Sequence, residues 1–359
     1  MAIKRSVFDY RRADIDGLRR HLQSLDLRQL ISENGNINQD WLAWKNAFLG
    51  AESKFVPTKT LRGPNHLPWM NSTILHYIKK KISIRTRITS SCHTSERLKH
   101  KFRELRRTIK RMLRESRLDY INSICASREP NPKRFWSFFK IKSKVSHFPL
   151  KVSVKSSENQ RTYSNNNVDI VNTFNEYFAS IFTHDNNSDH NLGEHSDPEI
   201  ALEDITLTND EVITVLTNLN NNKAHGPDGI PARLLTETSS QIDPSLCPLF
   251  NKSLRCGVLP DDWKLANVVP AHKRGEKSYV ENYRPISLLS LISKVLERCV
   301  FHNIQHHVFQ QINPCQHGFV PRKSCVTQLI EVFEQIGRKL DNGKQIDVIY
   351  LDMSKAFDK

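Results

Sequence analysis

The feature that most constrains the fold is an apolar run, Val348–Leu351, which is followed at once by the carboxylate of Asp352. Turn residues Asp341–Gly343 precede the run, so the pattern predicts a turn, a buried strand, a carboxylate and a helix start. A side chain at the end of a buried strand is held rigidly, where it can reach a metal ion or a substrate. The second interpretation of Asp352 is a helix cap, which is a common role for Asp. The residues upstream favour the first interpretation.

Charge is distributed unevenly along the chain, whose formal net charge is +15. Residues 1–150 hold 32 Lys and Arg against 12 Asp and Glu, a net of +20, so the remainder carries −5. A basic half beside a mildly acidic half predicts that the first half binds a polyanion. A membrane surface is the weaker alternative, because no lipidation signal accompanies the charge.

Composition narrows the class of protein further. A chain of 359 residues with 38% hydrophobic residues is large enough for two or three domains with a sizeable core. No stretch approaches the roughly 18 apolar residues of a membrane span, and the N-terminus lacks an apolar signal core. We therefore expect an intracellular chain, nuclear or cytoplasmic, that does not enter a membrane. Seven cysteines without a Cys-x-x-Cys pair predict reduced thiols rather than a disulfide framework or a zinc knuckle.

The longest predicted helix covers residues 96–124. Its apolar residues recur at steps of four, three, four and three and form one stripe: Leu98, Phe102, Leu105, Ile109 and Met112. Ten of the 21 residues from Arg97 to Arg117 are Lys or Arg, and two are Glu. A charged helix face is usually solvated, but the scarcity of acids favours RNA or DNA binding here. The candidate phosphate contacts are Arg106, Arg107, Lys110 and Arg111.

Aromatic residues follow this helix, at Phe135, Trp136, Phe138 and Phe139. Aromatic side chains can stack on bases, but helix packing is their commoner use, and we expect packing here.

Periodicity and turn residues predict the remaining elements and three regions. Residues 1–150 form a basic helical region, residues 151–204 a polar linker with one docked helix, and residues 205–359 an α+β domain. The capping box Thr208–Glu211 opens a helix that runs to Leu219. Further helices are expected over residues 18–30, 41–48, 69–84, 168–182, 290–309 and 325–340, and a strand over residues 265–271. The helix over 325–340 carries an apolar face.

Five sequence blocks follow one another in the last region: Asn222–Ile230, Gly257–Lys264 with Val269–Lys273, Asn282–Leu289, Gln316–Ser324 and the segment around Asp352. These blocks resemble, in order, those of a non-LTR (LINE-type, jockey-like) retrotransposon reverse transcriptase, over about residues 205–359. Residues 1–200 resemble, more weakly, the linker between endonuclease and polymerase in such elements. That weaker match rests on Val56–Lys59, Pro68–Trp69 and Pro132–Trp136.

The resemblance implies a right-hand polymerase fold. The chain would hold the fingers and the first palm strand, after the basic helical region, and would be truncated within the polymerase domain. The implied activity is that of an RNA-directed DNA polymerase, with an RNA template, a DNA primer and deoxynucleoside triphosphates as partners. No endonuclease motif set is visible.

The implied catalytic centre uses two Mg²⁺ ions, about 4 Å apart, which prefer hard carboxylate oxygen. By resemblance, Asp352 bridges both ions, and Met353 offers its backbone carbonyl oxygen to one of them. Phe357 matches the aromatic residue that stacks under the incoming sugar and rejects a 2′-hydroxyl; an ordinary core Phe is the alternative. The family's other carboxylates come from a downstream aromatic-x-Asp-Asp hairpin, whereas the Asp-Asp pair here, Asp261–Asp262, lies upstream. We therefore expect this chain to be inactive alone.

The resemblance also assigns residues to the substrates. Arg284 matches the fingers Arg, whose planar fork suits phosphate oxygens, and either Lys273 or Arg274 supplies a second cation. A solvated surface charge is the alternative for each. The template-binding candidates are Gln316, Gly318, Phe319, Arg322 and Lys323, where Gly318 would permit close backbone approach. For Lys323 a plain surface role is as good an interpretation.

One rival interpretation of the whole chain remains open. Instead of a polymerase fragment, the chain is a non-enzymatic RNA- or DNA-binding remnant of a decayed element. A group II intron or telomerase-like polymerase is disfavoured by the block Tyr283–Ser287.

His302 and His306 are four residues apart, but no Glu stands between them in a His-Glu-x-x-His pattern, so we expect ordinary helix histidines.

Overall fold

A computed structural model describes residues 5–61, 67–90, 96–126, 135–139, 149, 151–155, 161–164, 166–182 and 202–352. The chain forms two units, one of Met1–Val7 with Thr58–Pro149 and one of Phe8–Pro57 with Leu150–Lys359. Within the described residues, helices predominate and the strands pair as three two-stranded sheets. This mixture agrees with the predicted α+β class. None of the described helices is both long and apolar enough to cross a membrane.

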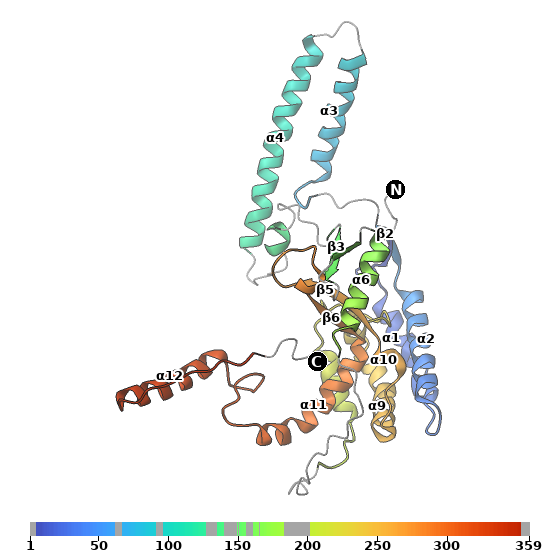
Figure 1. Ribbon diagram of the computed structural model, residues 1–359. Coiled ribbons are helices and arrows are strands. Elements are labelled where there is room, and N and C mark those ends of the chain that lie inside the picture. The colour runs from blue at the N-terminus through green and yellow to red at the C-terminus, as the bar shows by residue number, and fades with distance from the viewer. Residues whose placement is uncertain are drawn as a thin grey trace. The chain divides into compact units, whose positions relative to one another are not determined.

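The first unit is built on a pair of long helices that lie side by side (Figure 1). Its named elements are β1 (Arg5–Phe8), β2 (Thr58–Leu61), α3 (Ser72–Ser90) and α4 (Glu96–Cys125). The helix predicted over residues 96–124 is confirmed, and the middle of its apolar stripe is buried at Leu105 and Ile109. Helix α3 buries Ile74 and Ile84.

The second unit holds the remaining elements. They are α1 (Ile15–Ser24), the 3₁₀ turn η1 (Leu27–Leu30), α2 (Ile37–Phe55), β3 (Val152–Lys155), β4 (Arg161–Ser164), α6 (Asn167–Ala179), α7 (Asn209–Thr217), α8 (Ala232–Glu237), α9 (Ser239–Cys256), α10 (Asp261–Lys264), β5 (Ala266–His272), the 3₁₀ turn η2 (Val280–Asn282), β6 (Tyr283–Leu289), α11 (Leu291–Gln311) and α12 (Cys325–Asp341). The predicted capping box is confirmed at the start of α7, where Thr208 and Glu211 cap each other.

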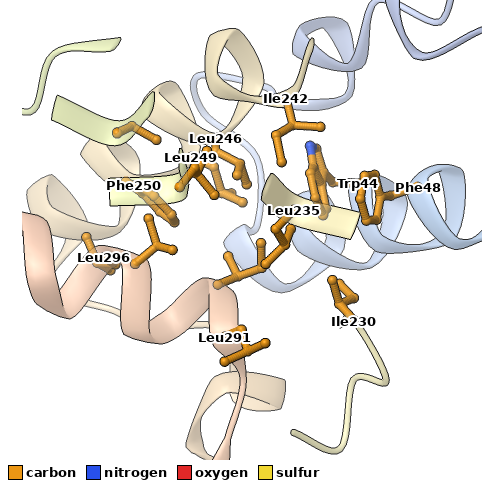
Figure 2. Close-up of a cluster of buried hydrophobic side chains, with 14 of the residues drawn as sticks. Trp44, Phe48, Ile230, Leu235, Ile242, Leu246, Leu249, Phe250, Leu291 and Leu296 are labelled. Carbon is orange, nitrogen blue, oxygen red and sulfur yellow. The ribbon is translucent and has the colours of Figure 1, made fainter. Parts of the chain in front are cut away.

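The main core of the second unit joins segments that are far apart in the sequence. Figure 2 shows members of one buried cluster, which include Trp44 and Phe48 of α2, Phe250 of α9 and Leu296 of α11. The rings of Trp44 and Phe48 stack at 4.9 Å. Residues 8–57 therefore fold together with the segment from Leu207 to Cys299, a long-range association that the local sequence pattern did not reveal.

A buried ion pair ties the same two segments together. Lys252 on α9 and Asp40 on α2 are 3% and 6% exposed, and Lys252 Nζ lies 2.6 Å from Asp40 Oδ2. The same ammonium group donates a second hydrogen bond, of 2.6 Å, to the Ser32 carbonyl oxygen. The two acceptors offset part of the cost of burying this side chain inside the core.

A smaller core joins α6 to strand β3, which precedes it, and to η2 and β6, which follow it. Phe174 and Phe178 of α6 pack with Val152 of β3, Val280 of η2 and Tyr283 of β6. The rings of Phe174 and Tyr283 meet edge to face at 4.9 Å. This contact anchors the start of β6.

The strand predicted over Val348–Leu351 is not formed. These residues lie outside any helix or strand, and Tyr350 and Leu351 are 89% and 87% exposed. A strand needs a neighbour to satisfy its backbone hydrogen-bonding groups, and no described strand pairs with this run. The apolar face predicted for α12 is likewise uncovered, because no described side chain of that helix is buried.

Candidate functional site

The predicted substrate-binding cations lie on a β-hairpin formed by β5 and β6. The two strands are antiparallel, with Ala271 opposite Arg284 and Pro270 opposite Pro285. The Lys273 amide continues the ladder by donating to the Asn282 carbonyl oxygen at 2.8 Å. Hydrogen-bonded pairs alternate with non-hydrogen-bonded ones along such a ladder, so Pro270 and Pro285 form a non-bonded pair. Neither proline costs the hairpin a hydrogen bond, which explains a strand through Pro285 that the sequence did not predict.

One face of this hairpin carries Lys273 and Arg284 together. Arg284 is opposite Ala271, and Lys273 is two residues beyond Ala271, so both cations project from the same face. Both are exposed. Tyr283 projects to the opposite face, where it is buried against Phe174. The hairpin is thus anchored on one face and presents two cations on the other.

The turn of the hairpin depends on a glycine. Gly275 has a φ of +80°, and a Cβ there would lie 2.7 Å from Asn282 Nδ2. That amide donates a hydrogen bond of 2.8 Å to the Glu276 carbonyl oxygen. Only glycine fits this left-handed position beside the amide. Arg274, in the same turn, is exposed.

The block Asn222–Ile230 supports the far end of β6. Asp228 is buried, and its Oδ2 accepts a hydrogen bond of 2.6 Å from Ser290 Oγ. Ser290 Oγ in turn accepts from the amides of Ile292 and Ser293, which caps α11. Burial is the main cause that raises the pKa of Asp228 above its usual value, against the opposing effect of the Ser290 hydrogen bond. Gly226 lies directly against this junction, since a Cβ there would lie 2.5 Å from the Ser290 nitrogen.

The block Gln316–Ser324 forms a loop fixed to the start of α12. His317 is 7% exposed, and its ring nitrogens hydrogen-bond with Thr327 Oγ1 at 2.9 Å and Glu331 Oε2 at 2.8 Å. Beyond it, Phe319 and Arg322 adopt positive φ values of 62° and 63°. Residues other than glycine rarely take this backbone conformation. The side chain of Phe319 is also 93% exposed.

The other template-binding candidates lie in the same loop. Gln316 Nε2 donates to the Gly318 carbonyl oxygen at 3.3 Å, and Lys323 Nζ donates to the Pro314 carbonyl oxygen. Open space surrounds the position where Gly318 would carry a Cβ. The anchoring role of His317 was not predicted, because local sequence does not distinguish a buried histidine from an exposed one.

The basic face predicted for α4 is exposed. Arg106, Arg107, Lys110 and Arg111 are all exposed, on the side away from Leu105 and Ile109. Arg111 pairs with Glu115 at 3.9 Å, with both side chains more than half exposed. Such surface pairs contribute little stability, so the face remains strongly positive.

An aromatic cluster lies near the end of α4. Phe138 packs against Trp69 with ring centroids 5.8 Å apart, and Tyr120 of α4 lies 5.7 Å from Trp69. The packing predicted for Phe138 is thus confirmed. Its neighbours differ, because Phe135, Trp136 and Phe139 are 44%, 60% and 46% exposed.

Comparisons with known proteins find relatives over part of the chain. No family model matches the chain. It is 36% identical over 152 residues to the probable RNA-directed DNA polymerase from transposon X-element of Drosophila melanogaster. It is also 28% identical over 153 residues to the corresponding protein from transposon BS, and 30% identical over 156 residues to the RNA-directed DNA polymerase from mobile element jockey, both of Drosophila melanogaster.

Over the matched residues, this chain is homologous to non-LTR retrotransposon RNA-directed DNA polymerases. The matches cover 42–43% of this chain and span only 17% of the length of each relative.

Of the two predicted metal ligands, Asp352 lies within the described residues, where it is exposed, and Met353 lies outside them. Phe357, the predicted sugar contact, also lies outside the described residues. Across the part of the chain that the structure describes, no three His, Cys, Asp or Glu side chains group as a metal site. No hydrogen bond or ion pair among those residues joins Asp352 to Lys273 or Arg284. The described donors therefore do not fit a two-ion Mg²⁺ centre.

The pair Asp261–Asp262 has a structural role in this polymerase homologue. Asp262 accepts hydrogen bonds from the Trp41 indole at 3.0 Å and from Lys45. The Lys45 contact is the main cause that lowers the pKa of Asp262. Asp261 pairs with Lys264 at 2.9 Å. Asp261 also accepts a hydrogen bond of 3.0 Å from Asn38 Nδ2 of α2, so both carboxylates hold α10 against α2.

Proposed function

We propose that this chain supplies the nucleotide- and template-binding part of an RNA-directed DNA polymerase, comprising the fingers and the start of the palm. The observation that carries the proposal is the shared, exposed face of Lys273 and Arg284 on an anchored hairpin. Homology to polymerases over part of the chain supports it. Template RNA, primer DNA and deoxynucleoside triphosphates are the proposed partners.

The hairpin suits a triphosphate for geometric reasons. Diagonal neighbours on one face of an antiparallel pair lie roughly 5–8 Å apart, so two cations there can contact neighbouring phosphates of one chain. Arg284 supplies a planar fork for two phosphate oxygens, and Lys273 supplies a point charge. Arg274 follows Lys273 in the turn and is the alternative second cation.

The remaining assignments belong to the same proposal. Asp352 would give one carboxylate to a Mg²⁺ centre whose other carboxylates come from outside the described residues, with Met353 beside it. Phe357 would contact the sugar of the incoming nucleotide. The loop that carries Gln316, Gly318, Phe319, Arg322 and Lys323 would contact the template. Its anchor, His317, supports this role, because a loop that is fixed at one end positions its exposed tip reproducibly.

Primer extension tests the proposal. The chain should show no extension alone with Mg²⁺ or Mn²⁺, because it offers too few carboxylates for two ions. Fusing it to the polymerase segment that follows the matched region of the jockey relative should create activity. In that chimera, Asp352→Asn should abolish extension, and Arg284→Ala should raise the KM for deoxynucleotides about tenfold or more. Phe357→Ala should admit ribonucleotides.

A matched control separates these effects from a general loss of charge. Arg255→Ala removes an exposed cation on α9, away from the hairpin, and should leave the KM unchanged. Extension by the unfused chain, or an active Asp352→Asn chimera, would contradict the assignment.

A second function, nucleic-acid binding by the first unit, is favoured by the exposed cations of α4. This activity would persist in a chain that does not catalyse. Replacing Arg106, Arg107, Lys110 and Arg111 with Glu should weaken RNA binding across sequences and flatten its dependence on salt, because fewer counterions are released. Binding that is insensitive to salt would instead indicate a merely solvated face.

A further inference from the structure

Three aromatic side chains of the first unit form an exposed surface. Residues 135–139 make one helical turn, and Phe135, Trp136 and Phe139 contact one another with ring centroids 5.0–6.2 Å apart. The three are 44%, 60% and 46% exposed. We call these three side chains the aromatic platform. Clustered exposed aromatics on a folded unit mark interaction sites.

The platform is held in place by contacts of the same helical turn with Trp69. Phe138, on the same turn, packs edge to face on Trp69 at 5.8 Å. Trp69 is itself fixed to α4, because its carbonyl oxygen accepts a hydrogen bond of 2.8 Å from Ser116 Oγ. The helical turn is therefore tied to the C-terminal part of the basic helix through the half-buried ring of Phe138, while its other three rings are exposed.

Ring geometry leaves π-faces open. Phe135 and Trp136 are nearly perpendicular, with an interplanar angle of 84°, and the other two pairs are tilted by 52–55°. Rings that meet edge to face use only one face of one partner. Trp136, the most exposed of the three, can thus accept a further flat ring.

Charge indicates which partner brings that ring. The Arg117 guanidinium lies 6.0 Å from the Trp69 ring and 5.8 Å from the ring of Phe138, which is on the same helical turn as the platform. Arg114 is exposed one turn earlier on α4, and residues 1–150 carry a net charge of +20. A partner must therefore combine negative charge with flat, unpaired rings. Single-stranded nucleic acid has both.

We propose that the aromatic platform stacks unpaired bases of a single strand whose phosphates lie along the basic face of α4. The proposal deepens the nucleic-acid binding proposed above and rests on it for the phosphate contacts. Stacking on an aromatic side chain is tolerant of base identity. The first unit would thereby distinguish single strands from duplexes, in which the bases are already stacked.

Three probes test this with the full chain: a single-stranded oligodeoxynucleotide of about 12 residues, the same strand with abasic spacers, and a blunt duplex. The chain should bind the base-bearing strand about tenfold more tightly than the abasic one, and the duplex should gain no such advantage over the abasic strand. Trp136→Leu should remove this preference without weakening abasic binding, and Trp136→Phe should keep most of it. Phe301→Leu, an exposed aromatic on α11, is the control and should change nothing.

Each failure has a distinct signature. If the abasic strand does not bind at low salt, the phosphate-binding proposal for α4 fails. If it binds as tightly as the base-bearing strand, or if Trp136→Leu keeps the preference for bases, the stacking proposal is overturned. In the last case the platform docks a protein or a membrane surface instead.

Discussion

Gly226→Ala should destabilise the second unit by pushing apart the junction between β6 and α11. The new Cβ would lie 2.5 Å from the Ser290 nitrogen and 2.7 Å from the Leu289 carbonyl oxygen. Both are backbone atoms, so no side-chain rotation can relieve the contact. An ordinary contact between heavy atoms is about 3.5–4.0 Å. The turn and the junction would therefore have to separate by about 1 Å.

The cost follows from three contributions. Overpacking of a closely packed site costs about 1–3 kcal/mol. Displacing Ser290 would also weaken the cap of α11, a contribution of about 1 kcal/mol. Replacing Gly with Ala stabilises by up to about 1 kcal/mol through the unfolded chain. The net loss is about 1–3 kcal/mol.

Urea unfolding, followed by tryptophan emission, measures this loss. Trp41, Trp44 and Trp263 are fully buried in the core and report on its exposure. The control is Gly50→Ala, because Gly50 is exposed within α2 and nothing lies within 4 Å of its missing Cβ. That variant should be neutral or more stable by up to about 1 kcal/mol. If the two variants unfold at the same urea concentration, the Gly226 contact does not constrain the fold.

Two further predictions concern buried charge. Asp40→Ala leaves the Lys252 ammonium buried with only the Ser32 carbonyl oxygen, and should lower the free energy of unfolding in urea by about 3–5 kcal/mol. The double variant Asp40→Leu with Lys252→Met should lower it by much less than the sum of the single changes. Burial raises the pKa of Asp228, so the folded protein binds this proton more tightly than the unfolded chain does. The stability that this proton confers is present below the usual Asp pKa of 3.8 and is lost as pH rises through the raised value. The Asp228→Asn variant has no ionisable group at this position. Its urea midpoint should therefore rise relative to that of the natural chain as pH rises from about 4 to 7, and a difference that does not change with pH would refute the assignment.

Local signals in the sequence predicted local structure well. The capping box at Thr208 and the apolar stripe of α4 each depend on residues within a few positions, and both were confirmed. Helix α9 was not predicted, because Pro244 and Pro248 lie within it. Burial of side chains such as Leu246 and Phe250 outweighs the local cost of those prolines.

Local sequence patterns could not predict the features that depend on distant residues. The expected strand before Asp352 needs a pairing partner that its own sequence cannot specify. The buried pair of Asp40 and Lys252 joins positions 212 residues apart. At the candidate site, family resemblance named Lys273 and Arg284, but only the strand register showed that they share a face.

The prolines of the β5–β6 hairpin have a consequence for its outer edges. At a non-bonded pair, each backbone nitrogen points away from the partner strand, so Pro270 and Pro285 remove one donor from each edge of the sheet. A further strand cannot continue the ladder past either position. The hairpin can therefore keep Val269 and Ile286 39% and 49% exposed beside its cations without inviting edge-to-edge aggregation. Substituting either proline with valine would open one edge to a second copy of the chain.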